Sequence, residues 1–132
     1  MRILVKIGGA QLEETEPRAQ LCKAIAAARR QGHEIVVVHG GGNQIRQLGG
    51  ELGLQDRYHE GLRITDARTA DVVLMVLGGQ VNRTLVAALQ RAGVPASGIC
   101  GADGSSFAAR KLTKPGVDLG FGIVEGEGRP QA

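Results

Sequence analysis

Two glycine-rich turns, each directly after a short apolar segment, carry the residue types best suited to holding an anion. Glycine lets backbone N–H groups approach a ligand closely, and a helix that starts after such a turn adds a partial positive charge. Lys6 places a fixed positive charge beside the first turn. The sequence therefore predicts a site for a phosphate or a carboxylate. The glycines of the two turns are Gly8, Gly9, Gly40, Gly41 and Gly42.

The spacing of these glycines matches neither of the two common nucleotide-binding motifs. Ile45 stands where a G-x-G-x-x-G fingerprint starting at Gly40 needs its third glycine, and G-x-x-x-x-G-K-[ST] occurs nowhere in the chain. A structural tight turn accounts for one or two glycines but not for three in a row. Close approach of a ligand is the better interpretation of the second turn.

Arg63 is the candidate for binding a carboxylate. It lies in an irregular segment just before a predicted helix, where functional residues tend to collect. Its guanidinium can hold a carboxylate by two parallel charge-assisted hydrogen bonds. The alternative is a surface arginine paired with Glu60 or Asp66.

The other polar residues do not form a recognisable catalytic or metal-binding set. No Ser/His/Asp combination can be assembled, and the three histidines are too far apart to indicate a metal site. His39 is interpreted as a packed imidazole, and Asn82 as either a helix cap or a ligand-binding amide. Cys22 and Cys100 lack the spacing of a metal site or a disulfide framework, so we expect two reduced thiols.

The amino-acid composition of the chain indicates which classes of binding partner to expect. Sixteen basic residues against 13 acidic ones are scattered along the chain, and one Tyr, two Phe and no Trp leave no stacking platform for bases. We expect no nucleic-acid partner. No apolar run approaches the ~20 residues that span a bilayer, and Lys6 interrupts the first apolar stretch. The expected location is the cytoplasm, without a membrane partner.

Apolar segments alternate with amphipathic ones, which predicts an α/β fold with a mainly parallel sheet sandwiched by helices. We expect one domain over residues 1–124 and a frayed tail over residues 125–132. Pro17 suits the first turn of its helix, Asn43 and Thr65 are expected caps, and Gly78-Gly79 should bend or interrupt a helix. The expected strands are 2–7, 34–39, 96–100, 107–112 and 119–124, the expected helices are 17–31, 43–52, 66–77 and 81–92, and 54–62 is an excursion with a hairpin.

The order of several short motifs resembles the N-terminal lobe of the N-acetylglutamate kinases, of the amino acid kinase family. The resemblance extends to about Val124, and each motif is weak alone while their ordered combination is specific. The motifs are 5–9 (VKIGG), 38–43 (VHGGGN), 61–65 (GLRIT), 81–85 (VNRTL), 98–104 (GICGADG), 109–111 (ARK) and 118–120 (DLG).

The resemblance implies transfer of the γ-phosphoryl group of ATP, with Mg²⁺, to the side-chain carboxylate of N-acetyl-L-glutamate in arginine synthesis. By matching positions, Lys6 would stabilise the transferring group and Gly8 and Gly9 would lie along the phosphates. Gly41 and Gly42 would offer backbone N–H groups to the substrate, and Arg63 would bind its α-carboxylate.

The same resemblance implies a second lobe, with the nucleotide site and further catalytic residues, that this chain does not contain. Two alternatives therefore stay open: a kinase for N-acetylaminoadipate in lysine synthesis, or a non-catalytic module that binds acidic amino acids. The chain begins at its first strand, as in the arginine-insensitive homodimeric type. That similarity implies a homodimer through the helix around Asp66–Leu77, with an apolar surface from Val72, Val73, Val76 and Leu77.

Overall fold

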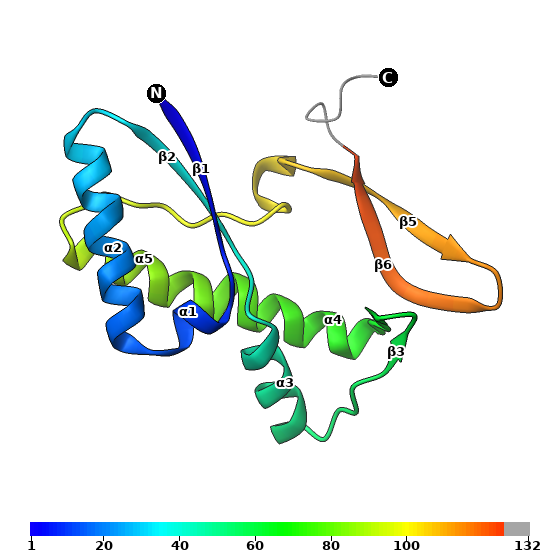
Figure 1. The fold of residues 1–132 in the computed structure, drawn as a ribbon. Helices are drawn as coiled ribbons and strands as arrows, with labels where there is room; N and C mark the ends of the chain where they lie inside the picture. Colours follow the sequence, from blue (N-terminus) through cyan, green and yellow to red (C-terminus); the bar gives the residue numbers. More distant parts are fainter. Residues whose placement is uncertain (126–132) are drawn as a thin grey trace.

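The computed structural model describes residues 1–125, and the side chains of all of these except Thr113 and residues 121–125. Strands and helices alternate along the chain (Figure 1). The predicted tail lies outside the described residues except for Glu125, which ends the last strand. The elements are β1 (Arg2–Ile7), α1 (Ala10–Glu13), α2 (Thr15–Arg30), β2 (Glu34–His39), α3 (Gly42–Glu51), β3 (Tyr58–His59), β4 (Leu62–Arg63), α4 (Ala67–Leu74), η1 (Met75–Val81), α5 (Asn82–Arg91), η2 (Asp103–Ser105), β5 (Ala108–Lys114) and β6 (Val117–Glu125).

Strands β1 and β2 form a parallel pair joined through α2. Their register runs from Arg2 opposite Glu34 to Ile7 opposite His39, so both strands end at the same edge. The two glycine turns therefore leave the sheet side by side.

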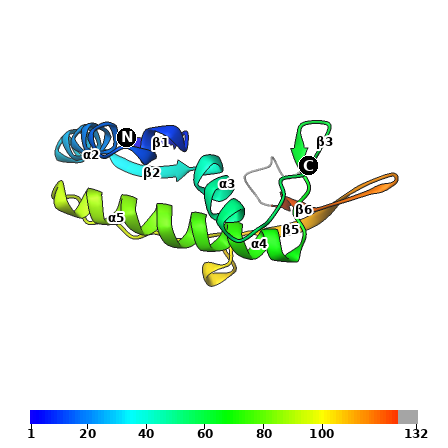
Figure 2. The ribbon, with the colours of Figure 1, turned by 90° about the horizontal axis from the view of Figure 1, so that it is seen from below.

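One face of this strand pair packs against helices. Because side chains alternate between the faces of a strand, Val5 and Ile7 point inward with Ile35 and Val37 from the neighbouring strand. They meet apolar residues of α2 and α5, which lie together on this side (Figures 1 and 2). The buried core residues are Ile7, Leu12, Cys22, Ile25, Ala26, Ile45, Val72, Val76, Val81, Leu85, Ala88, Leu89 and Val94.

The opposite face of the strand pair is open. Leu4 is 69% exposed, and Val36 and Val38 are also exposed on this face. The α/β class and the parallel pairing are as expected, but the described residues supply a helical layer on one face only. Parallel strands are normally covered on both faces, so this surface is an incomplete part of the sandwich.

A single long helix, made of α4, η1 and α5, runs from Ala67 to Arg91 beneath the sheet (Figure 2). The expected interruption at Gly78-Gly79 is wrong, because these residues continue the helix as part of a π-helical turn. By length and composition the helix is apolar enough to cross a membrane. We interpret it as the core helix, since Val76, Val81 and Leu85 pack into the core.

The side chains of this helix also correct the expected dimer surface. Val72 and Val76 are 2% and 0% exposed and belong to the core of the chain itself, so they cannot supply an outer apolar surface. Val73 and Leu77 are half-buried against the same core. The exposed apolar side chains of the helix are Leu74, at 60%, and Met75, at 56%.

The helix caps differ from the predicted ones. Asp66, not Thr65, caps α4, and its carboxylate accepts a hydrogen bond from the Thr69 N–H at 2.9 Å. The Thr65 N–H instead donates to the Leu119 carbonyl at 2.8 Å, which ties β6 to the start of the helix. Asn43 does not cap α3, because it lies inside the helix and its Oδ1 accepts from Arg46, while its Nδ2 donates to Glu13 at 2.7 Å.

The remaining comparisons between the expected and the observed elements concern short strands and one short helix. The expected strand at 96–100 forms no ladder among the described residues, and its Gly98 carbonyl accepts a hydrogen bond from the Arg83 side chain at 2.7 Å. Both expected hairpins are present, as β3–β4 and as β5–β6, and the latter projects away from the helices (Figure 1). Helix α1 was not predicted, since four residues are too short to show a helical period.

Candidate functional site

The two glycine turns meet through their backbones. A Cβ added to Gly9 would lie 3.0 Å from the Gly41 Cα, 3.1 Å from the Gly41 nitrogen and 3.3 Å from the Gly42 nitrogen. Any larger residue at position 9 would push the turns apart. The structure thus brings together the candidate glycines of two turns that lie more than thirty residues apart in the sequence.

Gly41 also fits tightly against the long helix. A Cβ at this position would lie 2.8 Å from the Leu77 Cδ2 and 3.1 Å from the Val81 Cγ2, both in the π-helical turn. Gly42, the first residue of α3, faces open space, with no atom within 4 Å of an added Cβ. Gly41 is therefore required for close packing against the long helix, while Gly42 is exposed.

The start of α3 has the features of an anion site. No side chain caps it, so its first backbone N–H groups are not covered by a hydroxyl or carboxylate cap. These groups and the helix dipole favour a negative charge directly after the second glycine turn. The sequence placed Gly41 and Gly42 in the turn before this helix, and α3 does start there, at Gly42 and not at a cap on Asn43.

Lys6 stands exposed near the end of β1, opposite Val38. It alternates with Ile7, so it lies on the same open face as Leu4. Gly8 and Gly9 follow it directly, and a Cβ at Gly8 would approach the Gln11 Oε1 at 2.8 Å. The charge and the first glycine turn are therefore neighbours at the open edge of the sheet.

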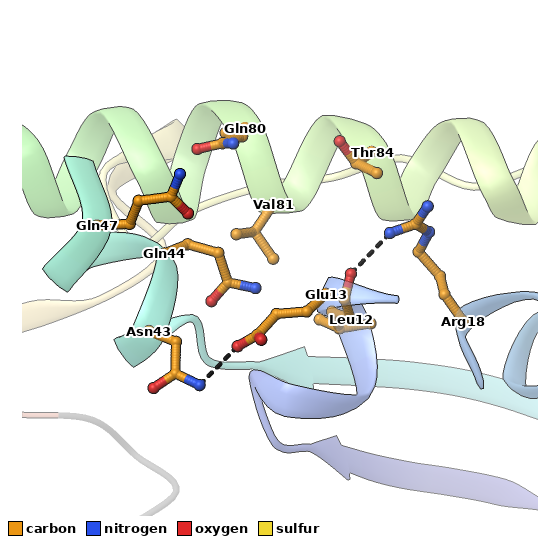
Figure 3. A pocket seen from close by; sticks show the side chains of 9 residues that line it. All are labelled: Leu12, Glu13, Arg18, Asn43, Gln44, Gln47, Gln80, Val81 and Thr84. Atoms are coloured by element: carbon orange, nitrogen blue, oxygen red, sulfur yellow. Dashed lines mark hydrogen bonds between the residues drawn. The ribbon is translucent and has the colours of Figure 1, made fainter. Parts of the chain in front are cut away.

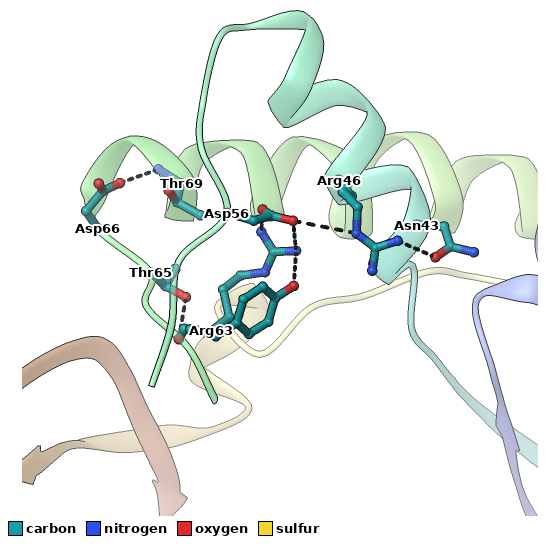
Figure 4. Close-up of polar contacts among 8 residues, drawn as sticks. Asn43, Arg46, Asp56, Arg63, Thr65, Asp66 and Thr69 are labelled. Atoms are coloured by element: carbon teal, nitrogen blue, oxygen red, sulfur yellow. Dashed lines mark hydrogen bonds and ion pairs between the residues drawn. The ribbon is translucent and has the colours of Figure 1, made fainter. Parts of the chain in front are cut away.

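Arg63 lies in β4 and not in an irregular segment as expected, and its side chain is largely buried, 19% exposed. Figure 4 shows its polar contacts. It forms a two-point ion pair with Asp56 through Nη1 and Nη2, and Nη2 also donates to the Tyr58 hydroxyl at 3.2 Å. The guanidinium lies 5.4 Å from the Tyr58 ring centre. Its partner is therefore neither of the two acids that the sequence suggested.

The two suggested acids have other partners. Glu60 pairs with Lys114, and Asp66 pairs with Arg57 at 3.3 Å. Sequence spacing favoured them because they lie three residues from Arg63. The hairpin register, which sets Tyr58 opposite Arg63, brings in residues from the preceding strand and loop instead.

A series of polar contacts connects Arg63 to the second glycine turn. Asp56 pairs with Arg46 at 3.5 Å, and the Arg46 Nη1 donates to the Asn43 Oδ1 at 3.1 Å (Figure 4). Asn43 then donates to Glu13 (Figure 3). Arg63 and the start of α3 thus belong to one network, in which Asp56 is the central acid.

A second network lies at the end of β2 and was not predicted as a unit. The Asn82 amide and the His39 Nε2 are 3.3 Å apart, and Arg83 donates to the Asn82 Oδ1 at 2.6 Å. Arg83 also holds the Gly98 carbonyl. Asn82 therefore does not cap α5, whose N-cap is Val81, and His39 is half-buried as a polar partner of Asn82.

A cavity of about 290 Å³ opens between α1, α3 and the long helix (Figure 3). Gln44 connects it to the glycine turns, since its Nε2 donates to the Gly9 carbonyl at 3.4 Å. The Gln44 Oε1 is buried and has no partner among the described residues. The lining residues are Leu12, Glu13, Arg18, Asn43, Gln44, Gln47, Gln80, Val81 and Thr84.

The donor set of the described residues suits phosphate more than metal. Lys6 and the helix start offer positive charge, whereas no group of three or more His, Cys, Asp or Glu side chains within residues 1–125 could hold a metal ion.

Burial raises the pKa of the Cys22 thiol, and the positive charge of Arg18 opposes this shift, so Cys22 acts as a packing residue.

Comparison with known proteins assigns the chain to a family. The model of the amino acid kinase family matches residues 1–127. The acetylglutamate kinase of Koribacter versatilis is 48% identical over 122 residues, which cover 92% of this chain and 46% of that protein. The acetylglutamate kinase of Acidobacterium capsulatum matches with the same identity and coverage. The chain spans about half the length of the curated relatives it matches.

Solved structures share the fold. A Streptococcus mutans protein superposes with a TM-score of 0.75 and 28% identity, over 94% of this chain and 49% of that one. The N-acetylglutamate synthase of Neisseria gonorrhoeae, solved with coenzyme A and N-acetyl-glutamate, superposes with a TM-score of 0.73 and 25% identity, over 93% of this chain and 28% of that one. With a family model that covers nearly all of its residues and relatives this similar, the chain belongs to the amino acid kinase family.

Proposed function

We propose that this chain is the substrate-binding half of an acetylglutamate kinase. The reaction is transfer of the γ-phosphoryl group of ATP to the side-chain carboxylate of N-acetyl-L-glutamate, a step of arginine biosynthesis. The observation that carries the proposal is the backbone contact between Gly9 and Gly41 beside the uncapped start of α3, in a chain 48% identical to acetylglutamate kinases.

Each site residue has a distinct role in this proposal. Lys6 neutralises the charge that develops on the transferring phosphoryl group, and Gly8 and Gly9 line the phosphates. Gly41 and Gly42 bring the backbone of the second turn to the substrate, and Arg63 binds its α-carboxylate. Phosphoryl transfer depends mainly on positioning and charge neutralisation, which these groups supply without forming a covalent intermediate.

ATP is the co-substrate in the proposal, and Mg²⁺ accompanies it. The positive charge of Lys6 and the backbone N–H groups at the glycine turns fit phosphate oxygens. Mg²⁺ commonly keeps several waters and binds mainly through the substrate phosphates, so it does not need a cage of side chains in this half. The remaining nucleotide contacts belong to the part of the relatives that this chain does not cover.

The assembly is proposed to be a cytoplasmic homodimer formed through α4 and the π-helical turn. Its contact surface is built on Leu74 and Met75, the exposed apolar side chains of that helix. Two such helices packed against each other would remove both side chains from water. Burial of large apolar side chains is the main favourable contribution to association.

Calorimetric titration with N-acetyl-L-glutamate tests the proposal, with glutamate and N-acetylaminoadipate as comparison ligands. We expect N-acetyl-L-glutamate to bind more tightly than either, and Arg63→Ala to abolish the heat. Arg57→Ala is the matched control, because Arg57 lies nearby and is an exposed arginine paired with a different acid. Equal binding by Arg63→Ala would remove Arg63 from the site, and no binding of any ligand would contradict a preformed substrate site.

A further inference from the structure

The hydrogen-bond donors of Arg63 are already committed to neighbours in the chain. A guanidinium carries five N–H donors, and two of its edges can each present a parallel pair to a carboxylate. Asp56 occupies the end-on edge, with one oxygen on Nη1 and the other on Nη2 at 3.3 Å. The Tyr58 hydroxyl takes a further donor of Nη2 at 3.2 Å, on the side-on edge.

No two-donor edge of Arg63 is therefore open to a ligand. The donors left over are the Nε–H and one hydrogen of Nη1, which point in different directions and cannot grip one carboxylate together. The side chain is also confined, because it is only 19% exposed and lies over the Tyr58 ring. A substrate carboxylate can form a two-point contact with Arg63 only if Asp56 or Tyr58 first gives up its hydrogen bonds to the guanidinium.

Asp56 is the partner best placed to withdraw. Its carboxylate is also paired with Arg46 at 3.5 Å, so it keeps a positive neighbour after leaving Arg63. Arg46 is in turn held by Asn43 at the start of α3, beside the second glycine turn. Tyr58 has no comparable second cation among its described contacts, and its ring stays against the guanidinium.

We propose that Asp56 is an internal competitor of the substrate carboxylate. In the free protein it holds the end-on edge of Arg63 and keeps the guanidinium in place; in the complex the substrate takes that edge and Asp56 pairs with Arg46 alone. Asp56 is thus a positioning residue that also lowers the affinity for substrate. The inference rests on the proposed function, since it requires Arg63 to bind a substrate carboxylate.

Substitution of Asp56 by Asn tests the exchange. Asp56→Asn keeps the size of the side chain but removes its charge, so we expect N-acetyl-L-glutamate to bind about threefold or more tightly, within the range of one partly exposed ion pair. Glu51→Gln is the matched control, because it removes one exposed acid at the end of α3. Arg46→Ala should weaken binding, since the displaced Asp56 then has no second cation.

Tyr58 supplies a readout independent of heat. It is the only tyrosine and the chain has no tryptophan, so the intrinsic emission reports on the Arg63 ring contact. Ligand should change this emission in the wild-type chain with the same midpoint as the calorimetric titration. In Asp56→Asn the midpoint should move to lower ligand concentration, whereas in Glu51→Gln it should not move.

The outcomes separate the two proposals. Binding by the wild type that is lost in Arg63→Ala but equal or weaker in Asp56→Asn overturns the competitor role and leaves the substrate site standing. Tightening in Tyr58→Phe but not in Asp56→Asn assigns the competition to the hydroxyl and also overturns it. No binding by either the wild type or Asp56→Asn contradicts both proposals, because removal of the competitor would then have exposed no site.

Discussion

Lys6 and Arg63 differ in how the chain holds them, and the difference assigns them to different stages of the proposed reaction. Arg63 is fixed by an ion pair and an aromatic ring, as suits a group that binds the ground-state substrate. Lys6 is exposed on the open side of the sheet. A flexible cation of this kind suits a charge that appears only during transfer.

Lys6→Ala should therefore leave N-acetyl-L-glutamate binding nearly unchanged and lower phosphoryl transfer by about 100-fold, the effect of removing one transition-state contact. Transfer is measured in a fusion of this chain to the remaining half of the Koribacter versatilis relative. Lys23→Ala, an exposed lysine on α2, is the control. A loss of binding in Lys6→Ala would mean that Lys6 contacts the substrate itself.

The glycine contact gives a second prediction for single residues. Gly9→Ala places a Cβ 3.0 Å from the Gly41 Cα, and backbone cannot easily yield, so we expect a loss of about 1–3 kcal/mol of unfolding free energy. Gly42→Ala meets no atom within 4 Å and lies in a helix, so it should be neutral or stabilising by about 0.5–1 kcal/mol. Urea denaturation of both variants measures the difference, and equal stability would contradict the tight contact.

At the scale of elements, the start of α4 depends on the ionisation of its cap. The Thr69 hydrogen bond, with a smaller contribution from Arg57, lowers the pKa of Asp66 below its usual value. A depressed folded-state pKa contributes stability that is fully present above the unfolded pKa of about 3.9 and is lost as the pH falls through the folded value.

Asp66→Asn should therefore destabilise the chain at neutral pH and make the acid limb of its stability curve shallower. The measurement is the denaturation midpoint between about pH 7 and pH 2, the range that brackets an ordinary aspartate pKa. Asp71→Asn, an exposed acid on the same helix, serves as the control. An unchanged acid limb in Asp66→Asn would assign the pH dependence to other carboxylates, such as Asp103 and Asp118, whose pKa values are also lowered by hydrogen bonds.

At the scale of the whole molecule, two exposed apolar surfaces have different explanations. Leu4, Val36 and Val38 form the open face of the strand pair, a face that parallel strands normally have covered. Leu74 and Met75 lie on the long helix, the element proposed to form the dimer. The first surface is a sheet face that the described residues leave uncovered, and the second is the proposed dimer interface.

Leu74→Glu should shift the chain from dimer to monomer in sedimentation experiments, because a charge would be buried where the two helices meet. Leu4→Glu is the matched control, because Leu4 is an exposed leucine on the open sheet face, 69% exposed against 60% for Leu74. It should leave the dimer unchanged. A dimer that survives Leu74→Glu but not Leu4→Glu would transfer the interface from the helix to the sheet.

What the sequence determined by itself was local or carried by short motifs. The period of apolar residues located β1, β2, α2, α3 and α5, since side-chain alternation and helical spacing are properties of neighbouring residues, and the turn at Lys114-Pro115-Gly116 indicated the β5–β6 hairpin. The two glycine turns stood out because three consecutive glycines have few structural uses. The ordered motifs predicted the family, which the comparison confirmed.

Only the tertiary structure decided which groups meet. The hairpin register brings Arg63 to Asp56, and Val72 and Val76 face inward because the long helix packs against α2 and α3. Gly78-Gly79 are helical, within the π-helical turn. The segment around Gly98 was expected to be a strand, but its carbonyl accepts a hydrogen bond from the Arg83 side chain. Each outcome depends on contacts between residues distant in the chain, whose free energies override local preference and leave no trace in local spacing.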